Sequence, residues 1–279
     1  MARDIPALRI LEAGEVDALV DWAANEGWNP GLDDAAAFRA ADAEGFLGAF
    51  VRGEMVAGIA AVAYGDASGF MGLYICRPDM RGRGFGRAVW DAGMARLAGR
   101  TVGLDGVPEQ QANYRSMGFD PLYRTVRFSG RFAGTGSAEG TRRLLPDDFD
   151  HVAAFDRRFF PAPRGEFLAR WLSAPHAAMV RLRNGKVCGY GVARRCREGF
   201  KVGPLFALDH HVATALMAAL ADGCDGVVHV DVPDRQEAFS ALLDANGFVA
   251  GFETARMYRG PAPAVALDGI FGITSLELG

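Results

Sequence analysis

A run rich in arginine and glycine is the feature of this sequence best suited to chemistry. Its members are Arg77, Arg81, Gly82, Arg83, Gly84, Phe85, Gly86 and Arg87. Glycines let a phosphate approach the backbone closely, and the arginines concentrate positive charge in a chain whose net charge is −4. The free N–H groups at the start of a helix bind anions. The run therefore predicts a phosphate-binding loop; the alternative, a solvated loop, is disfavoured by its place between a strand and a helix.

Two common nucleotide-binding motifs do not account for this loop. A Walker loop needs Gly-Lys followed by Ser or Thr, and the run contains no such triplet. A dinucleotide fingerprint needs a third glycine where Arg87 stands. The strands that precede the run also read as antiparallel, which does not fit the parallel unit of a dinucleotide-binding fold.

Hydrophobic periodicity predicts the elements that hold the loop. Helices are predicted at residues 15–26, from about residue 84, and up to Met117, where Gly118 serves as the cap. Strands are predicted at residues 45–52, 55–64, 69–76 and 101–107, the first two joined by a hairpin turn. Two further strands are expected to complete this part of the chain by Phe128.

A weak internal repeat divides the chain in two. Gly69-Phe70 recurs as Gly199-Phe200, and Gly118-Phe119 recurs as Gly247-Phe248, in the same order. The second copy predicts helices at 147–157, 165–173, 210–221 and 235–246 and strands near 178–182, 187–195, 200–206 and 226–232, with final strands after them. The join should lie near residues 130–140, where glycine and serine break the apolar pattern. We predict a first unit at residues 1–132, a second unit at 140–260 and a C-terminal tail at 261–279.

Composition excludes several other classes of protein. Hydrophobic residues make up 50% and charged residues 23% of the 279, which excludes global disorder. The negative net charge argues against nucleic-acid binding, and no stretch approaches the roughly 18 uncharged apolar residues of a membrane span. The N-terminus holds no apolar signal core, so we expect a cytoplasmic protein with reduced cysteines. The histidines and cysteines show no metal-binding spacing, so no metal is expected.

Two motifs give the sequence its resemblance to a known family. Arg81, Gly84 and Gly86 fit the acyl-CoA signature R/Q-x-x-G-x-G/A, and the segment from Tyr114 to Phe119 is similar to a Tyr-x-x-x-Gly-Phe segment. Both motifs, and the order of elements around them, resemble the GNAT superfamily of acyl-CoA N-acyltransferases, in particular a tandem-domain bacterial type. The resemblance covers residues 5–130 and, more faintly, 141–259. It implies an α/β fold with a mixed α+β sheet and two tandem GNAT-like domains, each a mostly antiparallel twisted sheet flanked by helices.

The resemblance also implies an activity. The chain is expected to move an acetyl group from acetyl-CoA to a primary amine of a small-molecule or amino-acid-like acceptor, by direct attack in a ternary complex. Two alternatives stay open at this point: a non-catalytic acyl-CoA-binding regulator, and an acyltransferase that uses a protein amine or a longer acyl group. The partners expected are therefore a small-molecule amine, with no nucleic acid and no membrane. The chain is expected to be a monomer, as a pseudo-dimer of its two units, or a homodimer.

Roles for individual residues follow from the resemblance. The pyrophosphate would lie on the N–H groups of residues 82–87, and the pantetheine arm would run along strand 69–76, where Cys76 and Arg77 offer backbone groups. The N–H near Cys76 would stabilise the oxyanion, and Tyr114 would protonate the departing thiolate. A nucleophilic thiol at Cys76 and a packing role for Tyr114 are the less favoured alternatives.

The acceptor side is less determined. Asp105 stands in an apolar strand, where a carboxylate is costly unless it has a role or a partner, so it is a candidate base or substrate contact. Asp231 occupies the matching place in the second copy, which suggests a structural role instead. Trp28, Asn29 and Asp33 lie in the helix–loop–helix segment where the superfamily builds its acceptor pocket; Trp28 would wall that pocket or anchor the loop.

The second copy departs from the family pattern. Its strand near residue 206 is followed by no Arg/Gly run, and Leu243 stands where the first copy has Tyr114. We therefore expect a non-catalytic second unit that helps to wall the acceptor site. The tail is too apolar to be free in solution, so it should dock as a strand or cover a sheet edge.

Overall fold

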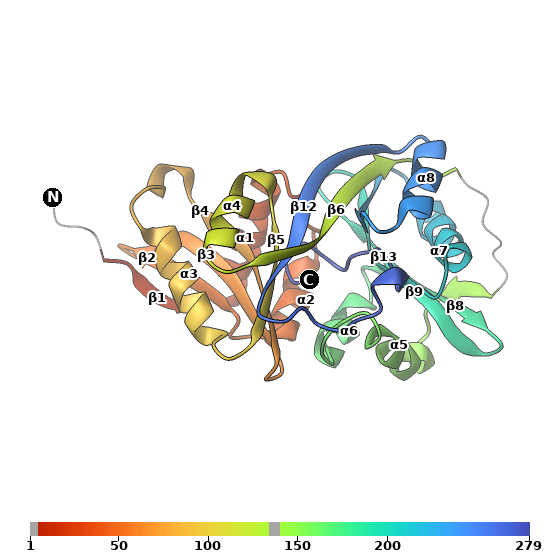
Figure 1. Cartoon of the computed structure of the whole chain (residues 1–279), viewed down its shortest axis with the longest axis horizontal. Helices are drawn as coiled ribbons and strands as arrows, with labels where there is room; N and C mark the ends of the chain where they lie inside the picture. Colours follow the sequence, from red (N-terminus) through yellow and green to blue (C-terminus); the bar gives the residue numbers. More distant parts are fainter. Residues whose placement is uncertain (1–4, 134–139) are drawn as a thin grey trace.

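The computed structural model describes residues 5–133 and 140–279, which form a single mixed sheet with helices on both faces (Figure 1). The helices are α1 Ala13–Asn25, α2 Asp34–Ala41, α3 Phe85–Arg96, α4 Pro108–Ser116, α5 Phe149–Asp156, α6 Gly165–Trp171, α7 His210–Asp222 and α8 Glu237–Ala245. The strands are β1 Ala7–Ile10, β2 Phe46–Val51, β3 Glu54–Tyr64, β4 Ser68–Cys76, β5 Thr101–Gly106, β6 Asp120–Gly130, β7 Thr141–Arg143, β8 Ala177–Arg183, β9 Lys186–Arg195, β10 Phe200–Ala207, β11 Val228–Pro233, β12 Val249–Arg259 and β13 Ile270–Gly272. The α/β class and the two-fold repeat of elements are confirmed.

Helical periodicity located α1 and α3 because each buries one apolar stripe, whereas α2 was not among the helices predicted from periodicity. In α1, Val16, Leu19, Val20 and Ala23 are buried at the spacing of a single helix face. The core on that face of the sheet joins α1 and α2 to α5 and α6 of the second unit. Helices α3 and α4, and separately α7 and α8, pack on the opposite face.

One prediction about the strands was wrong. We expected two strands after α4, but the structure has one long strand, β6, at Asp120–Gly130. No Gly-containing turn interrupts residues 120–129, so the segment stays extended. The neighbour that a second strand would have supplied comes from the other unit.

The two units exchange these final strands. The sheet order runs β4-β5-β12-β6-β11-β10, so β12 lies beside β5 of the first unit and β6 lies beside β11 of the second. Where β6 meets β12, Asp120 is opposite Tyr258 and Ser129 is opposite Val249. This antiparallel pairing is what a pseudo-two-fold axis between the strands produces. The exchange places residues of the second unit beside the first unit's β5.

Each unit also contains a split between two parallel strands. In the first unit, residues 68–71 of β4 pair with residues 101–104 of β5, and beyond these residues the two strands diverge. In the second unit, residues 200–202 of β10 pair with residues 228–230 of β11, and beyond them the two strands are not paired with each other.

The C-terminal tail docks as predicted: β13 pairs with β10, and the C-terminus ends at the centre of the molecule (Figure 1). Its docking rests on an apolar sequence that is buried from Ile270 to Gly279.

The domain boundaries of 1–132, 140–260 and 261–279 stay a prediction. Part of the expected join, residues 134–139, lies outside the described residues. Among the helices of residues 5–133 and 140–279, none is long and apolar enough to cross a membrane.

Candidate functional site

A cleft of about 710 Å³ lies where β4 and β5 diverge. Its lining includes Glu26, Trp28, Met71, Gly72, Leu73, Tyr74, Cys76, Arg81, Gly82, Gly84, Gly86, Arg87, Trp90, Leu104, Asp105, Asn113, Tyr114, Phe252, Thr254 and Leu276. One end of the cleft opens at the Arg/Gly loop (residues 77–87), and the other closes at Met71 and Leu104, where the strands pair. An elongated ligand with a negatively charged end would therefore bind with that end at the Arg/Gly loop and its other end at Met71 and Leu104.

The Arg/Gly loop presents the start of α3 to the open end of the cleft. Gly82 and Gly84 have φ angles of 75° and 92°, a left-handed backbone that favours glycine. Apart from the adjacent residues of the chain, no heavy atom lies within 4 Å of a Cβ built on either glycine, so the space beside them is open. Gly84 is the N-cap of α3, where N–H groups of the first helical turn lack partners within the helix. This cradle fits a phosphate group.

The arginines of the loop divide into two groups. Arg81 and Arg87 line the cleft. Arg81 Nε donates to the carbonyl of Cys76 (3.0 Å), and its Nη2 pairs with Glu26 at 2.5 Å. The other predicted phosphate ligands lie outside the lining: Arg77 is paired with Asp79 and Glu54, Arg83 is exposed, and Phe85 is buried in the core.

Strand β4 carries an irregularity beside the cleft. Its pairing with β3 shifts register between Ile75 and Gly72, and Leu73 between them has a φ of 47°. A left-handed conformation at a branched residue costs of order 1–3 kcal/mol and is found where backbone is re-aimed at a site. Sequence reasoning missed this bulge, although Gly72 stands beside it and a glycine inside a strand pattern can indicate one.

The N–H of Cys76 points toward the cleft. Arg77 N–H donates to the carbonyl of Val56 on β3 at 3.0 Å, and successive N–H groups along a strand point to opposite neighbours. Burial raises the pKa of the Cys76 thiol above its ordinary value, with a backbone bond from Gly86 opposing this. A raised pKa keeps the thiol protonated, which favours the backbone role predicted for Cys76 over a nucleophilic one.

Tyr114 projects from α4 into the cleft wall. Its ring stacks on Trp90 with centroids 5.5 Å apart, and Trp90 in turn contacts Tyr74 at 5.3 Å. Burial raises the pKa of Tyr114 to about 12, helped by the nearby Tyr74. The phenol therefore stays protonated near neutral pH and can donate a hydrogen bond. Tyr74 and Trp90 were missed at the sequence level, where they read as ordinary strand and helix aromatics.

Asp105 and its repeat partner Asp231 form matching ion pairs across the exchanged strands. Arg256 on β12 holds both oxygens of Asp105 at 2.8 and 2.9 Å, and Arg127 on β6 holds those of Asp231 at 2.7 and 3.0 Å. Burial raises the pKa of Asp105, and Arg256 opposes that shift. Around Asp231, burial is outweighed by Arg127 and Lys201, which lower its pKa to about 2. This repeated geometry favours the structural role that the sequence also offered for Asp105.

The acceptor side is built from three separate parts of the chain. Trp28 lines the cleft, and its carbonyl accepts hydrogen bonds from Arg127 and Lys201 at 3.0 Å each. Neither Asn29 nor Asp33 lines the cleft: Asn29 bonds the backbone of Glu198, and Asp33 is exposed at the start of α2. The opposite wall comes from Phe252 and Thr254 of β12 and Leu276 of the tail. Within the described chain the buried hydroxyl of Thr254 has no hydrogen-bond partner.

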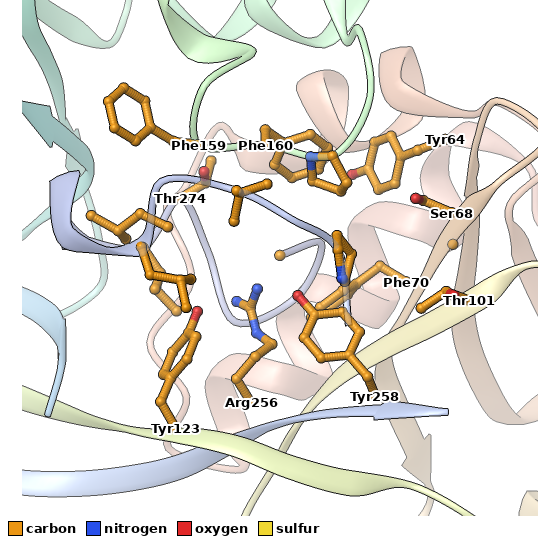
Figure 2. A pocket seen from close by; sticks show the side chains of 18 of the residues that line it. Tyr64, Ser68, Phe70, Thr101, Tyr123, Phe159, Phe160, Arg256, Tyr258 and Thr274 are labelled. Atoms are coloured by element: carbon orange, nitrogen blue, oxygen red, sulfur yellow. The ribbon is translucent and has the colours of Figure 1, made fainter. Parts of the chain in front are cut away.

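A smaller cavity lies between β12 and the loop after α5. Figure 2 shows aromatic side chains around it, among them Phe70, Phe160 and Tyr258, with Arg256 reaching in from below. Its volume of about 40 Å³ suits a few water molecules, so the large cleft is the candidate site. In residues 5–133 and 140–279, no three His, Cys, Asp or Glu residues gather as a metal site.

Comparison with known proteins gives a consistent result for both halves. Residues 15–119 match a model of the acetyltransferase (GNAT) family, and residues 152–272 match an acetyltransferase (GNAT) domain model. The chain is 36% identical over 265 residues to holothin acyltransferase from a Pseudoalteromonas species, covering 93% of this chain and 90% of the relative. It is 23% identical to the N-acetyltransferase YitH of Bacillus subtilis, covering 82% and 83%. A solved structure from Pyrococcus horikoshii, assigned as an acetyltransferase, shares the fold with a TM-score of 0.83 at 18% identity, covering 100% of this chain and 98% of that chain.

Proposed function

The chain belongs to the GNAT acyltransferases and is an acyl-transferring enzyme, and we propose that its first unit moves an acetyl group from acetyl-CoA to a primary amine of a small molecule. The observation that carries the proposal is the single cleft that joins the glycine cradle at the start of α3 to Tyr114. The cradle suits a pyrophosphate, and the diverging strands leave backbone groups of β4 free to pair with an extended arm.

The fit of acyl-CoA to these residues supports the proposal. The N–H groups of residues 82–87 would hold the pyrophosphate, with Arg81 and Arg87 supplying charge. The cleft from Cys76 to Met71 spans six residues of strand, which is five steps of roughly 3.3 Å, or about 16 Å. That length suits an extended pantetheine arm lying along β4.

Acyl-CoA, when bound, supplies an activated thioester whose carbonyl carbon the amine nitrogen attacks. The Cys76 N–H would donate to the carbonyl oxygen as negative charge develops there. Tyr114 would donate its hydroxyl proton toward the sulfur as the carbon–sulfur bond breaks. Trp90 and Gly106 hold the Tyr114 ring from two sides, so the hydroxyl position is fixed before the substrate arrives.

The amine must lose a proton before or during attack. Asp105 is one candidate acceptor of that proton, although Arg256 occupies both of its oxygens. A chain of waters leading out of the cleft is the second route. The unpartnered Thr254 hydroxyl is a further candidate contact for the acceptor.

The acceptor is proposed to enter between Trp28 and Phe252, which both line the cleft. One relative of this chain is named holothin acyltransferase, so holothin belongs in the set of amines to test. Purified protein with acetyl-CoA should release free thiol only with the correct amine. Thiol release with a small amine supports the proposal; release only with protein amines, or with no amine in a broad panel despite acetyl-CoA binding, would contradict it.

A further inference from the structure

The C-terminal tail fills the split of the second unit. Gly272 pairs with Leu205 of β10, Ile270 pairs with Phe206, and Ile273 N–H donates to the carbonyl of Asp231 on β11 at 3.0 Å. A Cβ on Gly203 would lie 2.5 Å from the carbonyl oxygen of Ile273, so tail and β10 backbones are in close contact. The tail therefore occupies in the second unit the place that is the open cleft in the first.

From this split the tail crosses to the first unit. A Cβ built on Gly72 of β4 would lie 2.0 Å from the carbonyl oxygen of Glu277, so only glycine permits this approach. Tyr64 Oη donates to the carbonyl of Leu278 at 3.0 Å. The segment is fixed internally as well, since Leu278 N–H donates to Ser275 Oγ at 3.1 Å. The end of the tail is thus a rigid part of the first unit's wall.

Leu276 lies at the closed end of the cleft. It lines the hollow together with Met71, Gly72 and Leu104, the residues where β4 and β5 come together. If phosphates bind at the Arg/Gly loop, the acyl group is the part of an acyl-CoA farthest from them and reaches this end. We propose that Leu276 forms the end wall of the acyl site and limits the length of the acyl group. This inference rests on the proposed function, since it requires acyl-CoA in the first unit's cleft.

The matched control is Leu278, two residues along the same tail. Leu276 and Leu278 are both buried leucines, 9% and 1% exposed. Leu276 lines the cleft, whereas Leu278 packs in the core around Tyr64 and Phe160. Leu276→Ala and Leu278→Ala both remove the same atoms from the tail, but only Leu276→Ala lengthens the acyl site.

The test compares the affinities of acetyl-, butyryl- and hexanoyl-CoA by calorimetry, which needs no acceptor. Leu276→Ala should raise the affinity for hexanoyl-CoA relative to acetyl-CoA by about 10-fold or more, because one misfitting methylene changes discrimination by about 10–200-fold. Leu278→Ala should leave the ratio unchanged. If Leu276→Ala does not fold, Leu276→Phe should shorten the site and lower the butyryl-to-acetyl ratio.

The outcomes separate the two proposals. If the wild type binds acyl-CoA but neither Leu276 variant shifts the ratio, or Leu278→Ala shifts it equally, the inference about Leu276 is wrong and the proposed function stands. If the wild type binds no acyl-CoA ester, the proposed function fails and the inference fails with it.

Discussion

At the scale of single residues, Tyr114 is the group with the clearest proposed chemical task. Tyr114→Phe keeps the ring that stacks on Trp90 and removes only the proton donor. General acids contribute about 10²–10⁴-fold, so turnover should fall by roughly 10-fold or more while acetyl-CoA affinity changes less. Steady-state kinetics with the identified acceptor measure this. Tyr123→Phe, a buried tyrosine outside the cleft, is the control and should keep full turnover.

The pH dependence of the reaction gives a second view of Tyr114. Its pKa is raised to about 12, so the phenol stays protonated, and therefore able to donate, until the pH approaches that value. The rate should show no loss from Tyr114 ionisation up to about pH 10. A descending limb near pH 8–9 that disappears in Tyr114→Phe would contradict the raised pKa.

Variants of Asp105 and of its ion-pair partner Arg256 test whether Asp105 is structural or catalytic. Arg256→Met leaves the Asp105 carboxylate buried without its cation, which should destabilise the fold by about 3–5 kcal/mol in urea unfolding. Adding Asp105→Asn removes the unpaired buried charge and should restore most of the lost free energy of unfolding. If the double variant keeps turnover, Asp105 is structural; if it folds but loses turnover at saturating substrates, Asp105 is the base after all.

At the scale of elements, the sequence predicted what is local and missed what is not. Periodicity located α1, α3 and the main strands of each unit because an element that buries one face has apolar residues at a regular spacing along the sequence. The exchange of β6 and β12 is different, since each strand would satisfy its apolar pattern beside either unit. Strand order between units depends on contacts more than a hundred residues apart, which no local pattern encodes.

The same distinction holds for the site. The Arg/Gly loop and Tyr114 were identified because each belongs to a short motif with a fixed spacing. Phe252, Thr254 and Leu276 line the same cleft but lie in exchanged or C-terminal segments with no motif of their own. Arg256 was missed as the partner of Asp105 for that reason: the repeat of Asp105 as Asp231 suggested a structural role but not the ion pair that the structure shows.

At the scale of the whole molecule, two similar units have become unequal. The first keeps its split open and carries the glycine cradle, whereas the second has its split filled by β13. The ion pairs Arg256–Asp105 and Arg127–Asp231 cross between the units, and the exchanged strands make one continuous sheet. The second unit therefore supports the first unit's cleft and supplies part of its wall.

The central claim is that acyl-CoA binds in one place, at the cradle of the first unit. Gly84→Trp would place a side chain in the open space beside α3, where phosphate is expected. Gly53→Trp is the matched control: Gly53 also has a positive φ, 86° against 92°, and also has open space beside it, but it lies in the hairpin turn between β2 and β3. Both variants carry the same backbone strain of about 1–2 kcal/mol.

Calorimetric titration of acetyl-CoA into the wild type, Gly84→Trp and Gly53→Trp tests this claim most directly. The account predicts about one site per chain in the wild type and in Gly53→Trp, and binding weakened by 10-fold or more in folded Gly84→Trp, since phosphate contacts at a helix start are lost. Two equivalent sites per chain, or unchanged binding in Gly84→Trp, would contradict it.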